Sequence, residues 1–387
     1  MTNHAAQMTD EGQSSTLQTT IQWLVVALSV YFLITAVGMI GGGFKAATKG
    51  DATQLFEFAT NPFMGLVVGI LATSLIQSSS TVTSIIVGLV AGGLSVEMAI
   101  PMVMGANIGT TITNTIVALG HIGRKKAFRR AFAAATVHDI FNLIAVVIFM
   151  TLELTTGILQ KIGAVLAESL VGGADVSVKG LNFIKPITKP VIGAVKDFAE
   201  FIYAPWANVL LVLFGVAIIF FSITLVGKLL KKLMVGRAKR IMHGAIGRGP
   251  VTGITSGAVV TVLVQSSSTT TSLMVPLAGA GSFRLKQIYP FTLGANIGTC
   301  ITSLLAATAV TGATALPAMT IALFHLTFNV LAVLVIYGIK NLRVLPLRGA
   351  MWLAKLATKN KVLALLYILG VYFALPGLLV LVYKLFS

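Results

Sequence analysis

Two clusters of amide and hydroxyl side chains interrupt apolar stretches of the chain: Gln77-Ser-Ser-Ser-Thr81 and Gln265-Ser-Ser-Ser-Thr269. Residues 61–96 and 249–283 contain no ionisable side chain, so these clusters are the polar centres of dry segments. A single serine in a membrane helix usually bonds back to a carbonyl of its own helix. Four adjacent hydroxyls cannot all do so, and each one buried without a partner costs about 1–3 kcal/mol. The clusters therefore favour a binding site for a small polar ligand.

An anion suits these clusters well. If the chain turns at each cluster, the next helix begins there and directs unpaired N–H groups at the turn. A helix N-terminus carries about half a positive charge and binds anions through its backbone donors. Hydroxyls both donate and accept hydrogen bonds, which suits a partly protonated oxyanion such as hydrogen phosphate. Such a site needs no lysine or arginine.

The sequence Gly-Ala-Asn-Ile-Gly-Thr occurs twice, at 105–110 and 294–299, and offers groups that suit a hard monovalent cation. Where glycines loosen a helix, freed carbonyls and side-chain oxygens can form the shell that transporters use for sodium. Close helix packing is the alternative role for these glycines. The candidate side-chain donors are Asn107, Thr110, Asn296 and Thr299.

Asp139 is the only carboxylate that we place within the hydrocarbon region. Intramembrane carboxylates are functional candidates, and this one could bind sodium, carry a proton or pair with a polar neighbour such as His138. His138 and His325 each begin the pattern His-x-x-Phe-Asn, which ends at Asn142 and Asn329. No cysteine or carboxylate set completes a transition-metal site with them. We expect these histidines and asparagines to hold helices together.

The composition places these motifs in a membrane protein. Of 387 residues, 56% are hydrophobic and 10% are charged, whereas soluble domains have about 25% charged residues. A soluble enzyme, a disordered chain and a disulfide-stapled protein are thereby excluded. Stretches long enough to span a bilayer, about 20 residues, lie at 22–42, 98–119, 131–152, 206–227, 288–309, 318–339 and 363–384.

The basic residues predict how these spans are oriented. The net charge is +17, and 20 of the 28 Lys and Arg residues fall in four loops without any acidic residue: 124–130, 228–248, 284–286 and 340–361. The positive-inside rule makes all four loops cytoplasmic. That assignment requires the two interrupted stretches to be re-entrant: 61–92 entering from outside and 253–280 from the cytoplasm.

An internal repeat relates the two halves of the chain. Residues 65–90 align without gaps to 253–278 with thirteen of 26 positions identical, and the other two motifs follow in the same order. A basic loop follows the first Gly-Ala-Asn motif but precedes the second, so the halves have opposite orientations. Inverted repeats with broken helices are typical of secondary transporters that bind substrate near the midplane.

We therefore predict an all-α polytopic membrane protein with two inverted-topology repeats, each with a re-entrant helical hairpin and a glycine-broken transmembrane helix. The predicted parts are a polar tail at 1–20, repeats at 21–152 and 206–339, an extracytoplasmic loop at 153–205, and a basic cytoplasmic segment with the last span at 340–387.

Paired QSSS motifs, each followed by G-x-N-I-G-T and H-x-x-F-N segments, resemble the type II sodium–phosphate cotransporter family over about residues 20–380. The resemblance implies sodium-coupled symport of inorganic phosphate into the cell by alternating access, with both ligands bound by the QSSS regions. The implied phosphate ligands are Gln77, Ser78, Ser79, Ser80, Gln265, Ser266, Ser267 and Ser268. With the donors named above, the sodium candidates are Thr81, Asn107, Thr110, Thr269, Asn296, Thr299 and Asp139.

The chain is shorter than the animal members and lacks the cysteine pair of their large outer loop, which points to the bacterial inner membrane. The expected partners are inorganic phosphate, sodium as coupling ion and the lipid bilayer, with no nucleic acid, no other cofactor and no transition metal. Whether the chain forms a homo-oligomer stays open.

Three alternatives remain: a sodium-coupled symporter of another oxyanion such as sulfate or a carboxylate, a channel, and an intramembrane hydrolase or transferase with a serine nucleophile. The last needs a base within reach. The segments around the QSSS motifs hold none, so we predict no enzymatic activity.

Overall fold

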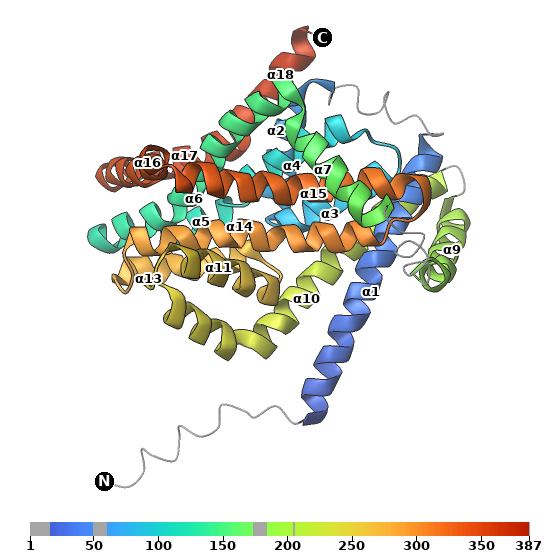
Figure 1. The fold of residues 1–387 in the computed structure, drawn as a ribbon, viewed down its shortest axis with the longest axis horizontal. Coiled ribbons are helices and arrows are strands. Elements are labelled where there is room, and N and C mark those ends of the chain that lie inside the picture. The colour runs from blue at the N-terminus through green and yellow to red at the C-terminus, as the bar shows by residue number, and fades with distance from the viewer. Residues whose placement is uncertain (1–15, 49–59, 173–183, 204–205, 387) are drawn as a thin grey trace.

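The computed structural model describes residues 16–48, 60–172, 184–203 and 206–386, and the regular structure in these ranges is helical (Figure 1). Seven stretches in them are long and apolar enough to cross a membrane: Leu17–Ala47, Val96–Leu119, Lys125–Thr156, Ala207–Leu230, Leu285–Thr308, Gly312–Tyr337 and Val362–Tyr383. Each coincides with a predicted span, which confirms an all-α, multi-pass membrane protein.

The elements of the first half lie in the order expected from the sequence. They are α1 (Thr16–Ala47), α2 (Pro62–Ile76), α3 (Ser79–Ala91), α4 (Val96–Gly109), α5 (Ile112–Leu119) and α6 (Lys125–Thr156). The starts of the short helices are fixed by side-chain caps: Asn61 accepts from the Phe63 N–H at 2.9 Å, and Ser95 accepts from the Met98 N–H at 3.3 Å.

The second half repeats this order. Its elements are α10 (Ala207–Ala245), α11 (Pro250–Val264), α12 (Ser267–Ser272), α13 (Met274–Ala280), α14 (Leu285–Thr308) and α15 (Ala315–Ala332), which continues as a π-helical turn over Val333–Tyr337. Between the halves lie α7 (Ile158–Ala167) and α9 (Ile184–Tyr203), and after them α16 (Lys340–Lys359), α17 (Val362–Leu369) and α18 (Leu375–Phe386).

Glycines let one pair of helices in each half approach to backbone contact. A Cβ on Gly69 of α2 would overlap the carbonyl of Met102 on α4. In the second half, a Cβ on Gly257 of α11 would overlap the carbonyl of Phe291 on α14.

The glycines of the Gly-Ala-Asn motifs lie in the same contacts. A Cβ on Gly105 would overlap the carbonyl of Leu66, and one on Gly294 would overlap the carbonyl of Ile254. Close packing, the alternative role predicted for these motif glycines, is therefore the one that both helix pairs display.

One prediction about the glycines is wrong. The helix of the first half is interrupted directly after its Gly-Ala-Asn motif, because α4 ends at Gly109 and α5 begins at Ile112. In the second half α14 runs unbroken through Gly294 and Gly298. Those glycines allow α11 to approach closely. A helix can continue through a glycine when packing holds its backbone in place.

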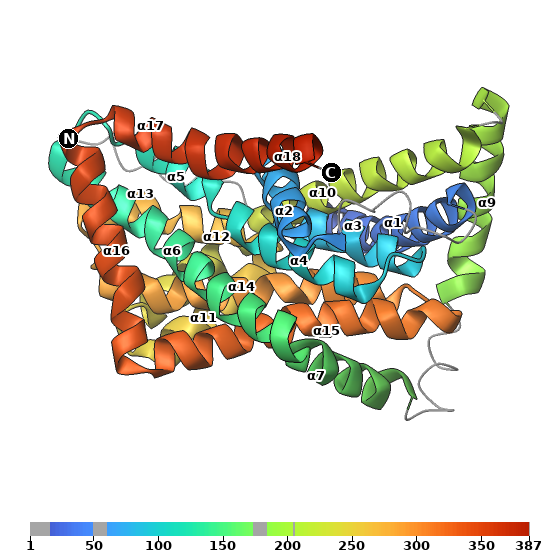
Figure 2. The same cartoon turned by 90° about the horizontal axis from the view of Figure 1, so that it is seen from above.

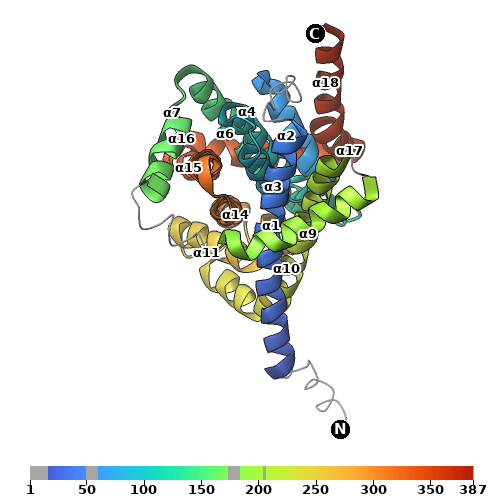
Figure 3. The same ribbon diagram turned by 90° about the vertical axis from the view of Figure 1, so that its right-hand side faces the viewer.

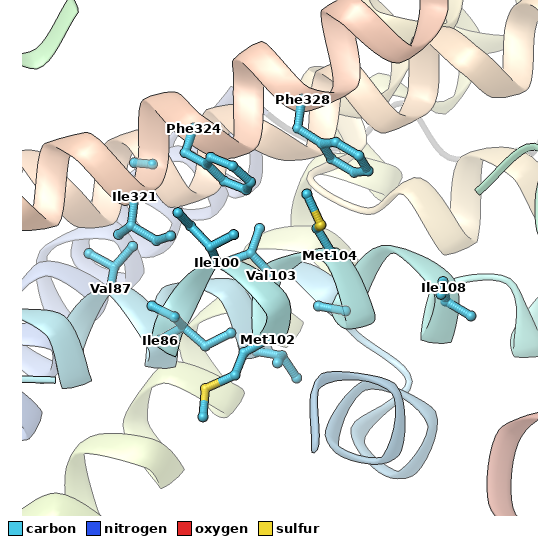
Figure 4. Packing of buried hydrophobic residues seen from close by; sticks show 14 of the residues in the cluster. Ile86, Val87, Ile100, Met102, Val103, Met104, Ile108, Ile321, Phe324 and Phe328 are labelled. Atoms are coloured by element: carbon cyan, nitrogen blue, oxygen red, sulfur yellow. The ribbon is translucent and has the colours of Figure 1, made fainter. Parts of the chain in front are cut away.

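The two halves share one apolar core. Ile100, Val103 and Met104 of α4 lie against Phe324 and Phe328 of α15 (Figure 4). The rings of Phe324 and Phe328 are stacked, with centroids 6.3 Å apart. Because α4 belongs to the first half and α15 to the second, van der Waals packing in this core holds the halves together.

Three of the four basic segments meet at one end of the molecule. Lys126 at the start of α6, Arg284 before α14 and Met351 on α16 line a common cavity. This end also holds α13, while α9 lies at the opposite end (Figures 1 and 2). Loops on one side of a membrane lie at the same end of the molecule, and the side on which these segments lie stays a prediction.

Two segments predicted as loops are helical. The region 153–205 contains α7, which packs against α15, and α9, which lies across α1 and α10 (Figure 3). Neither is among the candidate spans of the described residues, and the absence of a crossing in this region stays a prediction. The basic segment 340–361 is largely α16, which packs along α6. The predicted tail at 1–20 lies mostly outside the described residues.

Candidate substrate site at the two serine tracts

The two Gln-Ser-Ser-Ser-Thr clusters, 77–81 and 265–269, are called the serine tracts. Each begins at an abrupt helix break, as predicted. Gln77 ends α2 with φ 55° and ψ 28°, and Gln265 ends α11 with φ 54° and ψ 29°. These two glutamines are the non-glycine residues with positive φ in the described part of the chain. Such a conformation is uncommon outside glycine and clusters at functional sites. The nearly identical angles show that both halves build the same turn.

The first serine of each tract then starts the next helix. Ser78 is extended, and its hydroxyl oxygen accepts from the Thr81 N–H at 3.2 Å. Ser266 is extended likewise, and its oxygen accepts from the Thr269 N–H at 3.1 Å. Both side chains are N-caps, so their first role is to shape the turn.

The following serines are buried residues whose hydroxyls are not engaged. Ser79, Ser80 and Ser267 are 2%, 4% and 3% exposed. Within the described residues no hydrogen bond of these three hydroxyls is found, although their own carbonyls accept from residues four positions ahead in the helix. These hydroxyls are therefore the donors of the tracts that remain available to a ligand.

The two glutamines differ in their surroundings. The Gln77 side chain is exposed, whereas that of Gln265 is partly buried and engaged at both ends. Its Nε2 donates to the Val262 carbonyl at 2.7 Å, and its Oε1 accepts from Thr302 Oγ1 at 3.1 Å. The two turns thus have the same backbone conformation, but the side-chain amides of their glutamines have different surroundings.

Helices of the opposite half bound each tract. α3 packs against α14 and α15, and α12 packs against α5. Ser268 Oγ donates to the carbonyl of Thr110 at 3.4 Å, and Thr271 Oγ1 donates to Asn114 Oδ1 at 3.0 Å. Thr110 lies at the break between α4 and α5, so the interrupted helix of the first half faces the serine helix of the second.

All but one of the predicted sodium donors are buried, and Thr269 is partly buried. Thr110 and Thr299 each donate to a carbonyl four residues earlier, at 2.9 Å. Thr81 and Thr269 contact the capping serines, with oxygen–oxygen distances of 2.8 and 3.0 Å. Donation leaves the lone pairs of a hydroxyl free, so such oxygens can still coordinate a cation.

A reciprocal network links the Gly-Ala-Asn motif of each half to the His-x-x-Phe-Asn motif of the other. Asn107 of α4 donates through Nδ2 to Asn329 Oδ1 at 2.8 Å, and its Oδ1 lies 3.1 Å from His325 Nε2. Asn296 of α14 donates through Nδ2 to Asn142 Oδ1 at 2.8 Å, and its Oδ1 lies 2.6 Å from His138 Nε2.

This network confirms that the four histidine and asparagine residues hold helices together. Each asparagine of the Gly-Ala-Asn motifs contacts one asparagine of the opposite half through its amide nitrogen and one histidine of that half through its amide oxygen. All six side chains are buried, at most 3% exposed. The sequence indicated which histidines and asparagines hold helices together. Their hydrogen-bond partners lie far away in the sequence and were not predicted.

Asp139 lies against the last span. Its Oδ2 accepts from the hydroxyl of Tyr367 on α17 at 3.0 Å, and Tyr372 and Thr115 border the same carboxylate. Among the described residues its Oδ1 has no hydrogen bond of acceptable geometry. The side chain is 1% exposed. Sequence reasoning missed both tyrosines, although two phenolic groups in an otherwise apolar span are a signal that a polar neighbour is near.

Comparisons with known proteins agree with this architecture. A profile of the Na+/Pi-cotransporter family matches residues 32–171 and 218–343, one segment in each half. The chain belongs to this family. It is a family of cotransporters and not of enzymes, and within the described residues no hydrogen bond joins a serine of either tract to a histidine or a carboxylate.

Similar members of the family come from animals. Sodium-dependent phosphate transport protein 2A of Rattus norvegicus is 34% identical over 90% of this chain and 66% of its own length. Sodium-dependent phosphate transport protein 2B of Homo sapiens is 31% identical over 90% of this chain and 63% of its own length. The chain thus spans a little less than two thirds of these relatives. No solved structure matches the chain significantly.

Proposed function

We propose that the protein is a secondary active transporter that carries inorganic phosphate into a bacterial cell with sodium, by alternating access in the inner membrane. The observation that carries this proposal is the pair of serine tracts, one in each half, in which Ser79, Ser80 and Ser267 are buried and their hydroxyls have no hydrogen bond within the described residues. The relatives named above are sodium-dependent phosphate transport proteins, which supports the identity of both ions.

We further propose that the halves are inverted repeats whose broken helices, α2–α3 and α11–α13, are re-entrant hairpins. The matching angles at Gln77 and Gln265 support an internal repeat. The reciprocal pairing of Asn107 and Asn296 supports a twofold relation. The Gly-Ala-Asn motif of each half contacts the His-x-x-Phe-Asn motif of the opposite half. Re-entrant backbone is tolerated where protein covers it, and both tracts are covered.

In this proposal the phosphate lies between the two serine tracts. Ser79, Ser80 and Ser267 would donate to its oxygens directly, and Ser268 would do so after releasing the long bond to Thr110. Ser78 and Ser266 set the turns and present the first N–H groups of α3 and α12, and Gln77 and Gln265 border the turns. No fixed cation faces the anion, so sodium would supply the compensating charge.

The sodium ions would lie beside the phosphate. Thr81, Thr110, Thr269 and Thr299 offer hydroxyl oxygens, and Asp139 offers the carboxylate oxygen that lacks a described partner. Asn107 and Asn296 have one carbonyl lone pair left beyond the network, so they rank below the threonines as direct ligands.

Uptake into proteoliposomes tests the proposal. Labelled phosphate should accumulate only with an inward sodium gradient, and replacing sodium by potassium should stop it. Ser79→Ala and Ser267→Ala should each weaken phosphate binding by about 1–3 kcal/mol, the cost of a lost hydroxyl contact. Apparent phosphate affinity for uptake measures this.

Ser29→Ala is the matched control, because that hydroxyl bonds the Val25 carbonyl within α1 at 2.7 Å and should leave uptake unchanged. Uptake that ignores the sodium gradient would refute the proposal, and wild-type uptake by both tract variants would remove these serines from the site.

Competition separates phosphate from the second candidate, another small oxyanion. Excess unlabelled phosphate should suppress labelled uptake, while sulfate and a short carboxylate should not at equal concentration. Hydroxyls that both donate and accept favour hydrogen phosphate, which carries a donor, over fully ionised sulfate.

Asp139→Asn should raise the sodium concentration needed for half-maximal uptake. The substitution keeps the shape and removes the negative charge, so a cation at Oδ1 would lose its strongest partner. Glu153→Gln is the control: that carboxylate, at the other end of α6, accepts from the Leu159 N–H at 2.8 Å and holds the start of α7. Unchanged sodium dependence in Asp139→Asn would give Asp139 a structural role.

A further inference from the structure

A basic cavity of about 540 Å³ lies at the end of the molecule where α6, α13, α14 and α16 meet. Lys126, Arg129 and Arg130 come from the first turns of α6, and Arg284 comes from the residue before α14. Gly281 and Met351 complete the wall near them. The cations thus reach one cavity from both halves of the chain.

These four cations have no anionic partner in the part of the chain that the structure describes. The ion pair found there joins Lys196 to Glu200 on α9, at the opposite end (Figure 2). Asp139, the carboxylate on α6 that follows this cluster, is engaged with Tyr367. Positive charges gathered around one cavity repel one another, so an anion in the cavity is favoured.

A structural role accounts for one of the four. Gly281 ends α13 with φ 83°, and a Cβ there would collide with the guanidinium of Arg130. Arg130 therefore lies against the helix C-terminus, whose carbonyls carry partial negative charge. No hydrogen bond or ion pair of the Lys126 or Arg129 side chain is found within the described residues.

The cavity is separate from the serine tracts. From Ser267 to Gly281 the chain follows α12 and α13, which at helical rise is roughly 20 Å. At that separation the cations of the cavity do not contact a ligand bound at the serine tracts.

We propose that this cavity is a second anion site that binds a phosphate group between Arg129 and Arg284, with Lys126 as a further contact. A guanidinium binds phosphate oxygens in pairs, and here one guanidinium belongs to each half of the chain. The phosphate group comes either from free inorganic phosphate or from the headgroup of an anionic lipid in the adjoining leaflet. Neither source requires the protein to transport phosphate.

Binding to the full-length protein without sodium tests this proposal in two arms. One arm measures labelled inorganic phosphate retained by detergent-purified protein, and the other measures phosphatidylglycerol against phosphatidylcholine retained in native mass spectra. Arg129→Gln with Arg284→Gln should weaken the bound species at least about tenfold, since two charge-assisted contacts are lost. Both arginines are exposed, so the variant should fold.

Three comparisons make the result decisive. Lys359→Gln with Lys361→Gln removes two exposed charges outside the cavity and should bind like the wild type. Arg129→Lys keeps the charge without the paired donors and should bind with intermediate affinity. Ser79→Ala with Ser267→Ala should leave sodium-independent binding intact, which separates this site from the proposed transport site.

Retention of inorganic phosphate, of phosphatidylglycerol or of both by the wild type, with loss in the arginine variant, supports the site and identifies the source. Equal retention by the wild type and the arginine variant in both arms overturns the proposal, whatever the outcome of the transport assay.

Discussion

Alanine at Gly105 or at Gly294 is expected to prevent recovery of folded protein. A Cβ on Gly105 would overlap the carbonyl of Leu66 on α2, and a Cβ on Gly294 would overlap the carbonyl of Ile254 on α11. Neither obstacle is a flexible side chain, so the helices of each pair would have to separate. Separation would open the wall of the serine tract and cost more than about 4 kcal/mol, the exceptional range for one substitution.

Gly42→Ala is the control for this prediction. Gly42 also lies within a helix, α1, but a Cβ there would meet no atom within 4 Å. Alanine at such a position is neutral or stabilising by up to about 1 kcal/mol. Size-exclusion profiles and thermal unfolding in detergent compare the three variants. Monodisperse Gly105→Ala or Gly294→Ala protein with the wild-type melting temperature would show that the backbone contact is not required.

Much of the fold could be predicted because membrane spans follow local rules. Length and hydropathy found all seven spans, and the polar clusters marked both helix breaks to within a residue or two. The role of the glycines in the Gly-Ala-Asn motifs could not be predicted from such local rules. A glycine either loosens a helix or admits a neighbour, and only the approach of Ile254 to Gly294 shows that α14 uses the second option.

The contacts of the site were harder to predict than its members. The serines, Asp139 and the paired motifs were found from their types and spacing. Ser78 and Ser266 use their hydroxyls as N-caps, and this leaves the hydroxyls of the following serines free. The cap positions depend on the backbone conformation at each break, which the sequence does not reveal. The approach of Tyr367 to Asp139 joins a residue of the first repeat to one that lies far along the chain and outside both repeats, so no local pattern contains it.

The reciprocal network leads to the other large expected effect. Asn107→Ala leaves His325 Nε2 and Asn329 Oδ1 without their partner in a buried site. Each unsatisfied group costs about 1–3 kcal/mol, so the loss of stability should be roughly 2–6 kcal/mol. Asn296→Ala removes the equivalent pair of contacts, to His138 and Asn142, and should lower the melting temperature similarly.

A double-mutant cycle distinguishes this network from simple loss of packing. Combining Asn107→Ala with Asn329→Ala should cost less than the sum of the single variants by about 0.5–3 kcal/mol, because the two side chains share one bond. Asn341→Ala, at an exposed position of α16, should change stability by at most about 0.5 kcal/mol. Strict additivity in the cycle would mean that the amide contacts contribute no coupling. Coupling of the expected size would instead show that this contact between the halves contributes to stability. Asn107 lies on α4, and the C-cap of α4, Thr110, is the residue that Ser268 of the second serine tract contacts, so the network supports the wall of that tract.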